Sequence, residues 1–374
     1  MFRFIHSSDL HLGKRFGNFS GDLPGRLREA RHAVIGRLGA LAREHGATVV
    51  LLAGDTFDTG TPAPDVRRQA LAEMRHHAPL RWVILPGNHD SLQAAELWKN
   101  LKSEAPDNVV LAFEPKPTLL DAGVTLFPAP CTTRRPGRDL TEWMEGATTS
   151  DGVLRIGLAH GPILDFSEDN GASSVIAPDR ARRAGLDYLA LGDWHGSMSV
   201  DPRTHYSGSP EPDRFKHDKP GSALLVTIQG PRAEPEIQPL QAASFAWRSL
   251  PLHLLDGDDP ALAFAALLPE PTRRRNTLAR VVASGRSRLA DRTTLVAAVE
   301  QASPDFAFLE LDDDALATDC EAQDLDQIDR AGALREAANT LLAEADDELR
   351  SAPDREIARA ALSRLFSYAE RIGS

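Results

Sequence analysis

Five short apolar runs, each ended by a polar loop, most constrain the fold of this chain. They read FRFIHSSD, TVVLLAGD, RWVILPGNHD, LRIGLAHG and LDYLALGDWHG. Apolar runs of about 4 to 8 residues rich in Val, Ile and Leu are typical of buried strands. Between the first three runs, residues 23–46 and 63–77 carry apolar side chains at helical spacing. Strands that alternate with helices predict a parallel α/β core.

The pattern changes beyond residue 200. There, THYSGSPEPDRF and GSALLVTIQG predict a turn-linked strand pair, and EPEIQPL predicts an edge strand. We expect three parts: an α/β domain over 1–240, a small α/β domain over 247–315 and acidic helices over 324–374. The helices are predicted from two apolar stripes: Leu334, Ala338, Leu341, Ala345 and Leu349, then Ile357, Ala361, Leu365, Tyr368 and Ile372.

Charge is unevenly distributed along the chain. The net charge is −12, from 54 Asp and Glu against 42 Lys and Arg. Between Glu300 and the end lie 19 of these acids and 7 of these bases, so residues 1–299 carry 35 of each. The acidity therefore belongs to the C-terminal segment. The remainder permits nucleic acid as a partner but does not require it.

Two classes of protein are disfavoured by the sequence. Cys131 and Cys320 lie far apart and in no C-x-x-C spacing, which argues against a disulfide framework or a zinc knuckle. The chain has no apolar run of about 18 residues, and its first strand carries Arg3 and His6 instead of a signal-peptide pattern. We therefore expect a cytoplasmic protein with no membrane partner.

Side chains that bind metals follow every one of the five apolar runs. In open α/β sheets, ligands gather at the carboxyl ends of the strands, where these side chains would meet. A single D-x-H pair more often marks a turn, but five successive cases favour one shared site. The candidates are Asp9, His11, Asp55, Asn88, His89, His160, Asp193 and His195.

The donor set predicts the kind of site. Oxygen and nitrogen donors without thiolate favour manganese, iron or a similar cation over structural zinc. These donors are too many for one ion with open positions, whereas two ions bridged by a carboxylate would use them all. Two such ions can hold a hydroxide between them and stabilise an in-line phosphoryl displacement.

The motifs SDLH, GDTFD, GNHD, AHG and GDWH resemble the signature of the calcineurin-like metallophosphoesterases. HSSDLHLGKRF, LLAGDTFDTGTPAP, LPGNHDS and YSGSPEPDRF further resemble the SbcD-type nucleases, which are DNA-repair nucleases that work with an SMC-like ATPase. The resemblance covers about residues 1–230. It implies a β-sandwich flanked by helices, followed by a small α/β capping domain and C-terminal helices.

The resemblance also implies a role for each candidate. Asp55 would bridge two divalent ions, and His89 would assist the leaving oxygen. Asp58 and Asp90 would orient His89 and the ligands by hydrogen bonds, or serve as loop caps. The first ion would be held by Asp9, His11 and His195, and the second by Asn88, His160 and Asp193.

One position departs from the family pattern, which usually has His where this chain has Asp193. A carboxylate can hold the same ion, although it adds negative charge and favours harder ions such as Mn²⁺. A weakly filled second site is the alternative.

We therefore predict a Mn²⁺-dependent exonuclease that acts on DNA ends, with some single-strand endonuclease activity, associated with a bacterial nucleoid. A small-molecule phosphodiesterase or phosphatase, and a catalytically weakened DNA-end-binding partner of an ATPase, are the alternatives. The resemblance implies that the C-terminal helices bind the coiled coil of the ATPase. The alternative is that they pack on the chain's own core. The resemblance also implies that the protein can form a homodimer. Arginines between Arg273 and Arg292 either contact phosphates or form a solvated face.

Overall fold

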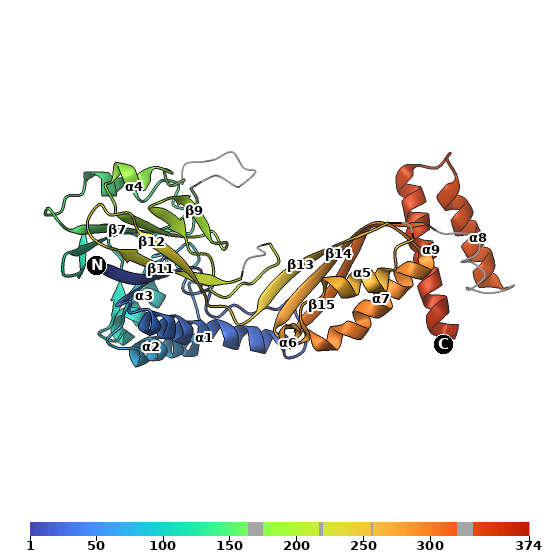
Figure 1. Cartoon of the computed structure of the whole chain (residues 1–374), viewed down its shortest axis with the longest axis horizontal. Coiled ribbons are helices and arrows are strands. Elements are labelled where there is room, and N and C mark those ends of the chain that lie inside the picture. The colour runs from blue at the N-terminus through green and yellow to red at the C-terminus, as the bar shows by residue number, and fades with distance from the viewer. Residues whose placement is uncertain (164–174, 217–219, 256, 320–331, 374) are drawn as a thin grey trace. The chain divides into compact units, whose positions relative to one another are not determined.

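The computed structural model describes residues 1–163, 175–216, 220–255, 257–319 and 332–373. The chain divides into two compact units, Met1–Ala246 and Trp247–Ser374 (Figure 1). Cys320 and the first residues of the predicted C-terminal segment, 324–331, lie outside the described residues.

The first sheet of the first unit has the strand order β12-β11-β1-β2-β3-β4. Its four parallel strands are β1 (Phe2–Ser7), β2 (Val49–Leu52), β3 (Arg81–Ile84) and β4 (Val109–Leu111). Two antiparallel strands extend it beside β1, namely β11 (Ser222–Ile228) and β12 (Glu236–Gln241). The predicted edge strand is therefore confirmed as β12.

The second sheet has the order β5-β6-β7-β8-β10-β9. Its parallel strands are β6 (Val124–Ala129), β7 (Leu154–His160), β8 (Tyr188–Gly192) and β10 (Thr204–Tyr206). The antiparallel strands β5 (Thr118–Asp121) and β9 (Met198–Asp201) form its edges. All five apolar runs identified in the sequence thus form parallel strands, three in the first sheet and two in the second.

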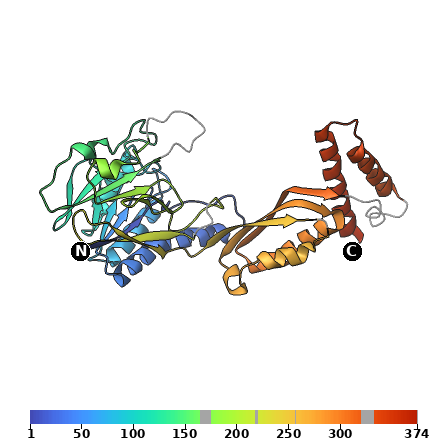
Figure 2. The same cartoon turned by 45° about the horizontal axis from the view of Figure 1, so that its top comes forward.

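Two packed sheets with helices outside them form the layers of this unit. Side chains such as Phe4, Leu51, Leu158 and Tyr188 fill the space between the sheets. Helices α1 (Leu23–Glu44), α2 (Pro64–His76) and α3 (Ala95–Glu104) cover the outer face of the first sheet, as the two ribbon views show (Figures 1 and 2). The short helices η1 (Glu142–Gly146) and α4 (Arg180–Arg183) cover the second. The predicted α/β fold, a β-sandwich flanked by helices, is confirmed.

One predicted pairing is wrong. The segment containing THYSGSPEPDRF forms β10, which pairs with β8 in the second sheet, whereas GSALLVTIQG forms β11, which pairs with β1 in the first. The two segments therefore lie in different sheets and do not form a hairpin. The YSGSP stretch passes beside the strand ends where the candidate ligands lie.

The second unit is built on a three-stranded sheet in the order β13-β14-β15. The strands are β13 (Ala246–Leu254), β14 (Thr277–Arg288) and β15 (Phe308–Asp319). Helices α5 (Pro260–Leu267) and α7 (Leu289–Ala302) pack on one face of this sheet through Phe264, Leu295 and Val299 (Figure 1). A short helix, α6 (Pro271–Arg274), and a 3-10 turn, η2 (Ser303–Asp305), connect these elements.

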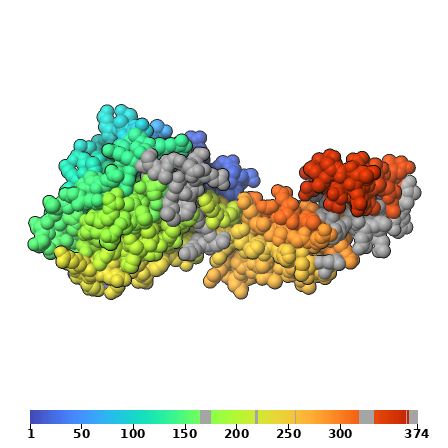
Figure 3. Space-filling model, turned by 90° about the horizontal axis from the view of Figure 1, so that it is seen from above, coloured from blue at the N-terminus to red at the C-terminus, as the bar shows by residue number. Residues whose placement is uncertain are grey.

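Two helices follow, α8 (Ala333–Asp346) and α9 (Ala352–Gly373), whose surface is red in Figure 3. Ala338 and Leu362 pack with Leu289 of α7. Ile357 of the predicted stripe is 67% exposed, whereas Leu365 of the same stripe packs against this cluster. The side chains of Tyr368 and Ile372 lie outside the described ones. Among the described helices, none combines the length and apolarity of a bilayer-spanning segment.

Candidate metal centre

The carboxyl ends of β1, β2, β3, β7 and β8 meet at one edge of the sandwich. Main-chain bonds hold their loops together: Asp9 N donates to Gly54 O at 3.1 Å and His11 N to Asp55 O at 2.9 Å. A bond of 2.8 Å between His160 Nδ1 and Ala53 O joins the two sheets. The predicted candidates therefore lie together.

The backbone at this edge is strained. Among the described residues other than glycine, six have a positive φ, and four of them are predicted ligands: Asp9 (54°), His11 (45°), Asp55 (53°) and Asp193 (101°). Such conformations cost about 1 to 3 kcal/mol each and persist only where the surrounding structure enforces them. Their concentration in one place favours a functional role for these loops.

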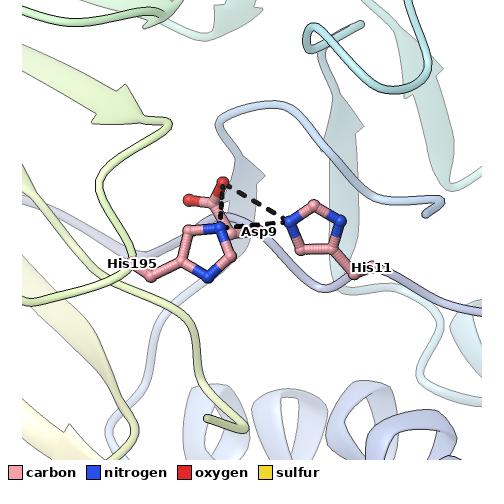
Figure 4. Close-up of side chains that lie close together, drawn as sticks. All are labelled: Asp9, His11 and His195. Carbon is pink, nitrogen blue, oxygen red and sulfur yellow. Dashed lines mark hydrogen bonds and ion pairs between the residues drawn. The ribbon is translucent and has the colours of Figure 1, made fainter. Parts of the chain in front are cut away.

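Asp9, His11 and His195 form the first half of the centre (Figure 4). The Nε2 atoms of the two histidines face each other at 3.3 Å, and Asp9 Oδ1 lies 4.0 Å from His11 Nε2 and 3.9 Å from His195 Nε2. Carboxylates lie beside both Nδ1 atoms, which favours the ring proton there and leaves both Nε2 lone pairs directed at each other. A cation between them would remove this repulsion.

Asn88, His160 and Asp193 form the second half. Asn88 Nδ2 donates to Asp193 Oδ1 at 2.9 Å, and His160 Nε2 lies 3.7 Å from the same oxygen. Among the described residues, Asn88 Oδ1 and His160 Nε2 are buried polar atoms without a hydrogen-bond partner. Both are metal-ligating atoms, so the chemistry of this half fits a cation.

Asp55 lies between the two halves. Its Oδ2 is 3.7 Å from His11 Nε2 and 3.5 Å from His160 Nε2. Two atoms that each bind one ion at about 2.1 Å lie roughly 3.0 to 4.2 Å apart, depending on the angle. The ligand spacings here fall within that range. The residues present therefore fit two divalent metals with a shared carboxylate.

Asp55 can approach the histidines because Gly87 gives it room. A Cβ atom on residue 87 would lie 2.2 Å from Asp55 Oδ1 and 2.3 Å from Asp55 N, closer than real contacts allow. Only glycine therefore fits at this position without moving the carboxylate that joins the two halves.

Carboxylates surrounding the ligands orient the first half. Asp58 Oδ1 lies 3.3 Å from His11 Nδ1, and Asp213 Oδ1 lies 3.4 Å from His195 Nδ1. This kind of role was predicted from the sequence for Asp58 but not for Asp213, although Asp213 belongs to the YSGSPEPDRF motif. Burial would raise the pKa of Asp213, but His195, Arg31 and Lys14 hold it well below its usual range.

Asp90 makes bonds of the loop-capping kind, the second of the two roles that the sequence left open for it. Its carboxylate accepts bonds from Gly87 N at 2.7 Å and Phe57 N at 3.0 Å, so it joins the loops after β2 and β3. Burial and the charge of Asp55 raise the pKa of Asp90 to about 7. His89 is oriented by Asp58 instead, whose main-chain oxygen lies 2.9 Å from His89 Nδ1.

His89 lies against the first half of the centre and is only partly buried. Its ring contacts that of His11 edge-on, with centroids 4.9 Å apart. Because Nδ1 faces a carbonyl oxygen, the proton of the neutral ring resides on Nδ1 and Nε2 remains free to meet a ligand.

Electrostatics within the centre reflect its crowded charges. Burial opposes ionisation of Asp55, yet His160 and His11 lower its pKa below the usual range. Burial raises the pKa of Asp193; His160 opposes this shift, while the charges of Asp9 and Asp55 add to it. Three carboxylates in one buried place therefore need cations to compensate them.

The arginines of the second unit are largely paired within that unit. Arg274 Nη1 lies 3.1 Å from Asp305 Oδ2, Arg292 Nη2 lies 2.7 Å from Asp313 Oδ2, and Arg280 pairs with Glu310. This pairing favours a solvated face over a phosphate-binding one.

The fold and this centre define the class as metal-dependent phosphoesterases, and comparison with known families agrees. Residues 2–197 match the calcineurin-like phosphoesterase family, so the chain belongs to that family. Among curated proteins, it is 30% identical over 271 residues to the SbcD subunit of the nuclease SbcCD from Escherichia coli strains K12 and O157:H7, over 60% of this chain and 64% of theirs. The protein of the same name in Bacillus subtilis is 30% identical over 93 residues, 24% of this chain and 22% of that protein.

The chain thus spans 64% of the length of its Escherichia coli relatives. Among solved structures, the crystal structure of TT1561 of Thermus thermophilus is 11% identical with a TM-score of 0.42, over 64% of this chain and 99% of that one.

Proposed function

We propose that this protein is a metal-dependent DNA phosphodiesterase, an exonuclease with single-strand endonuclease activity that serves DNA repair. One observation carries the proposal: seven ligand-type side chains from five strand ends lie together, with Asp55 between the other six. The similarity to part of a nuclease supports DNA as the substrate.

The protein's own residues would perform distinct tasks. Divalent cations bound here, for which we propose Mn²⁺, supply Lewis-acid chemistry that activates water and stabilises charge on phosphoryl oxygens. The first half would be held in place by Asp58 and Asp213, and the second by the bond between Asn88 and Asp193. In its doubly protonated form, His89 would give the Nε2 proton to the leaving oxygen and become neutral, while the Asp58 carbonyl keeps the other proton on Nδ1 and fixes the ring.

Substitutions of Asp193 test whether the protein is an active nuclease or a catalytically weakened one. If Asp193 is a ligand, the wild type holds two metal ions per chain and degrades labelled DNA with Mn²⁺, whereas Asp193→Ala loses one ion and most cleavage. Asp193→His is the matched control, since it restores the usual family ligand. A wild type that holds one ion and stays inert until His is introduced would instead identify a DNA-end-binding protein with a decayed site.

A small-molecule phosphodiesterase remains the second candidate because the same centre would serve it. Single- and double-stranded DNA and bis(p-nitrophenyl) phosphate separate the two. Preference for DNA supports the nuclease, whereas hydrolysis of the small ester alone contradicts it.

We further propose that α8 and α9 bind the coiled coil of an SMC-like ATPase. The relatives' name makes them one part of a complex, and Leu334 and Ile357 are 41% and 67% exposed on these helices. Leu334→Asp with Ile357→Asp should abolish co-purification with the ATPase while cleavage by the isolated protein persists. Retained binding would reject this surface. A homodimer and a location at the bacterial nucleoid also belong to this proposal.

A further inference from the structure

A cleft opens beside the second half of the metal centre, within the first unit. Asn88, His160 and Asp193 line it together with residues 134–138 of the loop 132–138. This loop carries three arginines, Arg134, Arg135 and Arg138, all of which line the cleft. The cleft therefore combines the predicted ligands of one ion with three cationic side chains.

Both ends of the loop are fixed to the site. Cys131 N donates to Pro86 O at 3.0 Å, and Leu92 N donates to Cys131 O at 2.9 Å, so the loop begins against the segment that carries Asn88 and His89. At the other end, Asp139 accepts bonds from Thr141 N at 2.8 Å and Arg180 Nη2 at 2.7 Å. The arginines are thus presented from a loop of defined position.

These arginines differ from their neighbours in how their charge is compensated. Arg180 and Arg183 on α4 both pair with Glu145, and Arg183 Nη2 lies 2.8 Å from Glu145 Oε1. Within the described residues, by contrast, the side chains of Arg134, Arg135 and Arg138 are exposed and have no ion pair or hydrogen bond. They are free to meet an anion in the cleft.

We infer that Arg134, Arg135 and Arg138 form a binding subsite for the phosphodiester backbone of the nucleic-acid strand next to the scissile bond. The inference rests on the proposed function and deepens it by naming where the strand leaves the centre. The ligand is a chain of phosphates, because three guanidinium groups along one loop match repeated anions better than a single small ester.

Charge balance explains the need for this subsite. The centre gathers the carboxylates of Asp9, Asp55 and Asp193, which repel a polyanion wherever bound cations do not cover them. Three arginines in the lining of the cleft that also contains Asp193 offset that repulsion. Pro136, Leu140 and Ile176 add apolar surface between the charges, against which sugar or base can pack.

The test compares two triple variants in the full chain. Arg134→Gln with Arg135→Gln and Arg138→Gln removes the subsite. The matched control, Arg43→Gln with Arg75→Gln and Arg232→Gln, removes the same charge from exposed arginines at the opposite edge of the strands. Binding of a labelled single strand and of a duplex is measured by fluorescence anisotropy over a salt series. The His89→Gln background limits cleavage, and each measurement is made with Mn²⁺ and again with EDTA.

The subsite variant should raise the Kd for the single strand by about 10- to 100-fold and reduce the magnitude of the salt slope by about 2, since each phosphate contact contributes about 0.7. Lysines at the three positions should restore most of the slope, which a merely structural role would not do. The control should bind as the wild type does.

The outcomes separate two failures. If the His89→Gln protein binds nucleic acid and the subsite variant made in it keeps the same Kd and salt slope, the inference is overturned while the proposed function stands. A loss seen equally in both triple variants also overturns it, because net charge would then be the cause. If the wild type neither binds nor cleaves nucleic acid, the proposed function and this inference fail together. If only duplex binding weakens, the strand assignment is wrong.

Discussion

The two halves of the metal centre are held in different ways. In the first half, each histidine has a carboxylate beside its Nδ1 atom, Asp58 for His11 and Asp213 for His195. In the second half, a main-chain oxygen orients His160, and Asn88 and Asp193 bond to each other. The first half therefore depends on outer side chains, whereas the second depends on the backbone and on its own ligands.

The largest effect is expected where the halves meet. Asp55→Ala removes the shared carboxylate, so both metal ions should be lost. Cleavage should fall by more than about 100-fold, which exceeds the loss expected when a residue that only orients a ligand is replaced. Metal content and DNA cleavage measured on the same sample check this. His89→Gln is the control: it should keep both ions while cleavage falls by about 10²- to 10⁴-fold. Retention of both ions by Asp55→Ala would contradict the bridging role.

Substitution of a carboxylate beside a candidate ligand tests whether the two halves are held in different ways. Asp213→Asn should weaken binding of one metal ion by about 10- to 100-fold, because it removes the charge that orients His195. Binding of the other ion should change little. Metal titrations that resolve the two ions provide the measurement. Equal weakening of both would show that the halves act as one unit and would remove the distinction drawn here.

The smallest effect concerns the link between the strands that carry the two halves. His6 on β1 is fully buried and lies 2.9 Å from Tyr188 Oη and 3.1 Å from Leu191 O on β8. Burial, with a contribution from His205, lowers the pKa of His6 from 6.5 to about 3. Neutral His6 thus stabilises the fold fully above pH 6.5, and this stability is lost as the pH falls from 6.5 toward 3.

His6→Gln should therefore flatten the acid side of the stability profile. Between about pH 6 and 4, the free energy of unfolding should depend on pH less steeply than in the wild type, by about 1.4 kcal/mol per pH unit. Denaturant melts over this pH range measure the slope. Other titrating groups cancel in the comparison, so parallel profiles would show that His6 is not buried in neutral form.

The sequence predicted which side chains lie together, because each candidate ligand follows an apolar strand. Asp9, Asp55 and His160 needed no tertiary information, since strand ends in a parallel sheet share one edge. Asp213 was missed for a physical reason: it lies after β10, outside any strand or helix, where no periodicity marks a position. The wrong pairing of the segments around β10 and β11 has the same origin, because a turn-rich stretch does not reveal which sheet follows it.

The C-terminal helices show a second limit. Successive residues of a helix point about 100° apart around its axis, so neighbouring apolar positions define different faces, and spacing alone does not say which face is buried. The predicted stripe contained both Ile357, which is exposed, and Leu365, which packs beside the buried Leu362; Ala358 is also buried. The contact with Leu289 of α7 selects the face, and helical spacing alone contains no information about that partner.

The left-handed backbone at four ligand positions sets a minimum size for this protein. At about 1 to 3 kcal/mol each, these conformations together cost an amount comparable with the whole net stability of an ordinary domain, about 5 to 15 kcal/mol. A small scaffold with the same loops would relax them and scatter the ligands. Two six-stranded sheets are therefore the frame that keeps this centre in shape, and a shortened sandwich is a poor starting point for transplanting it.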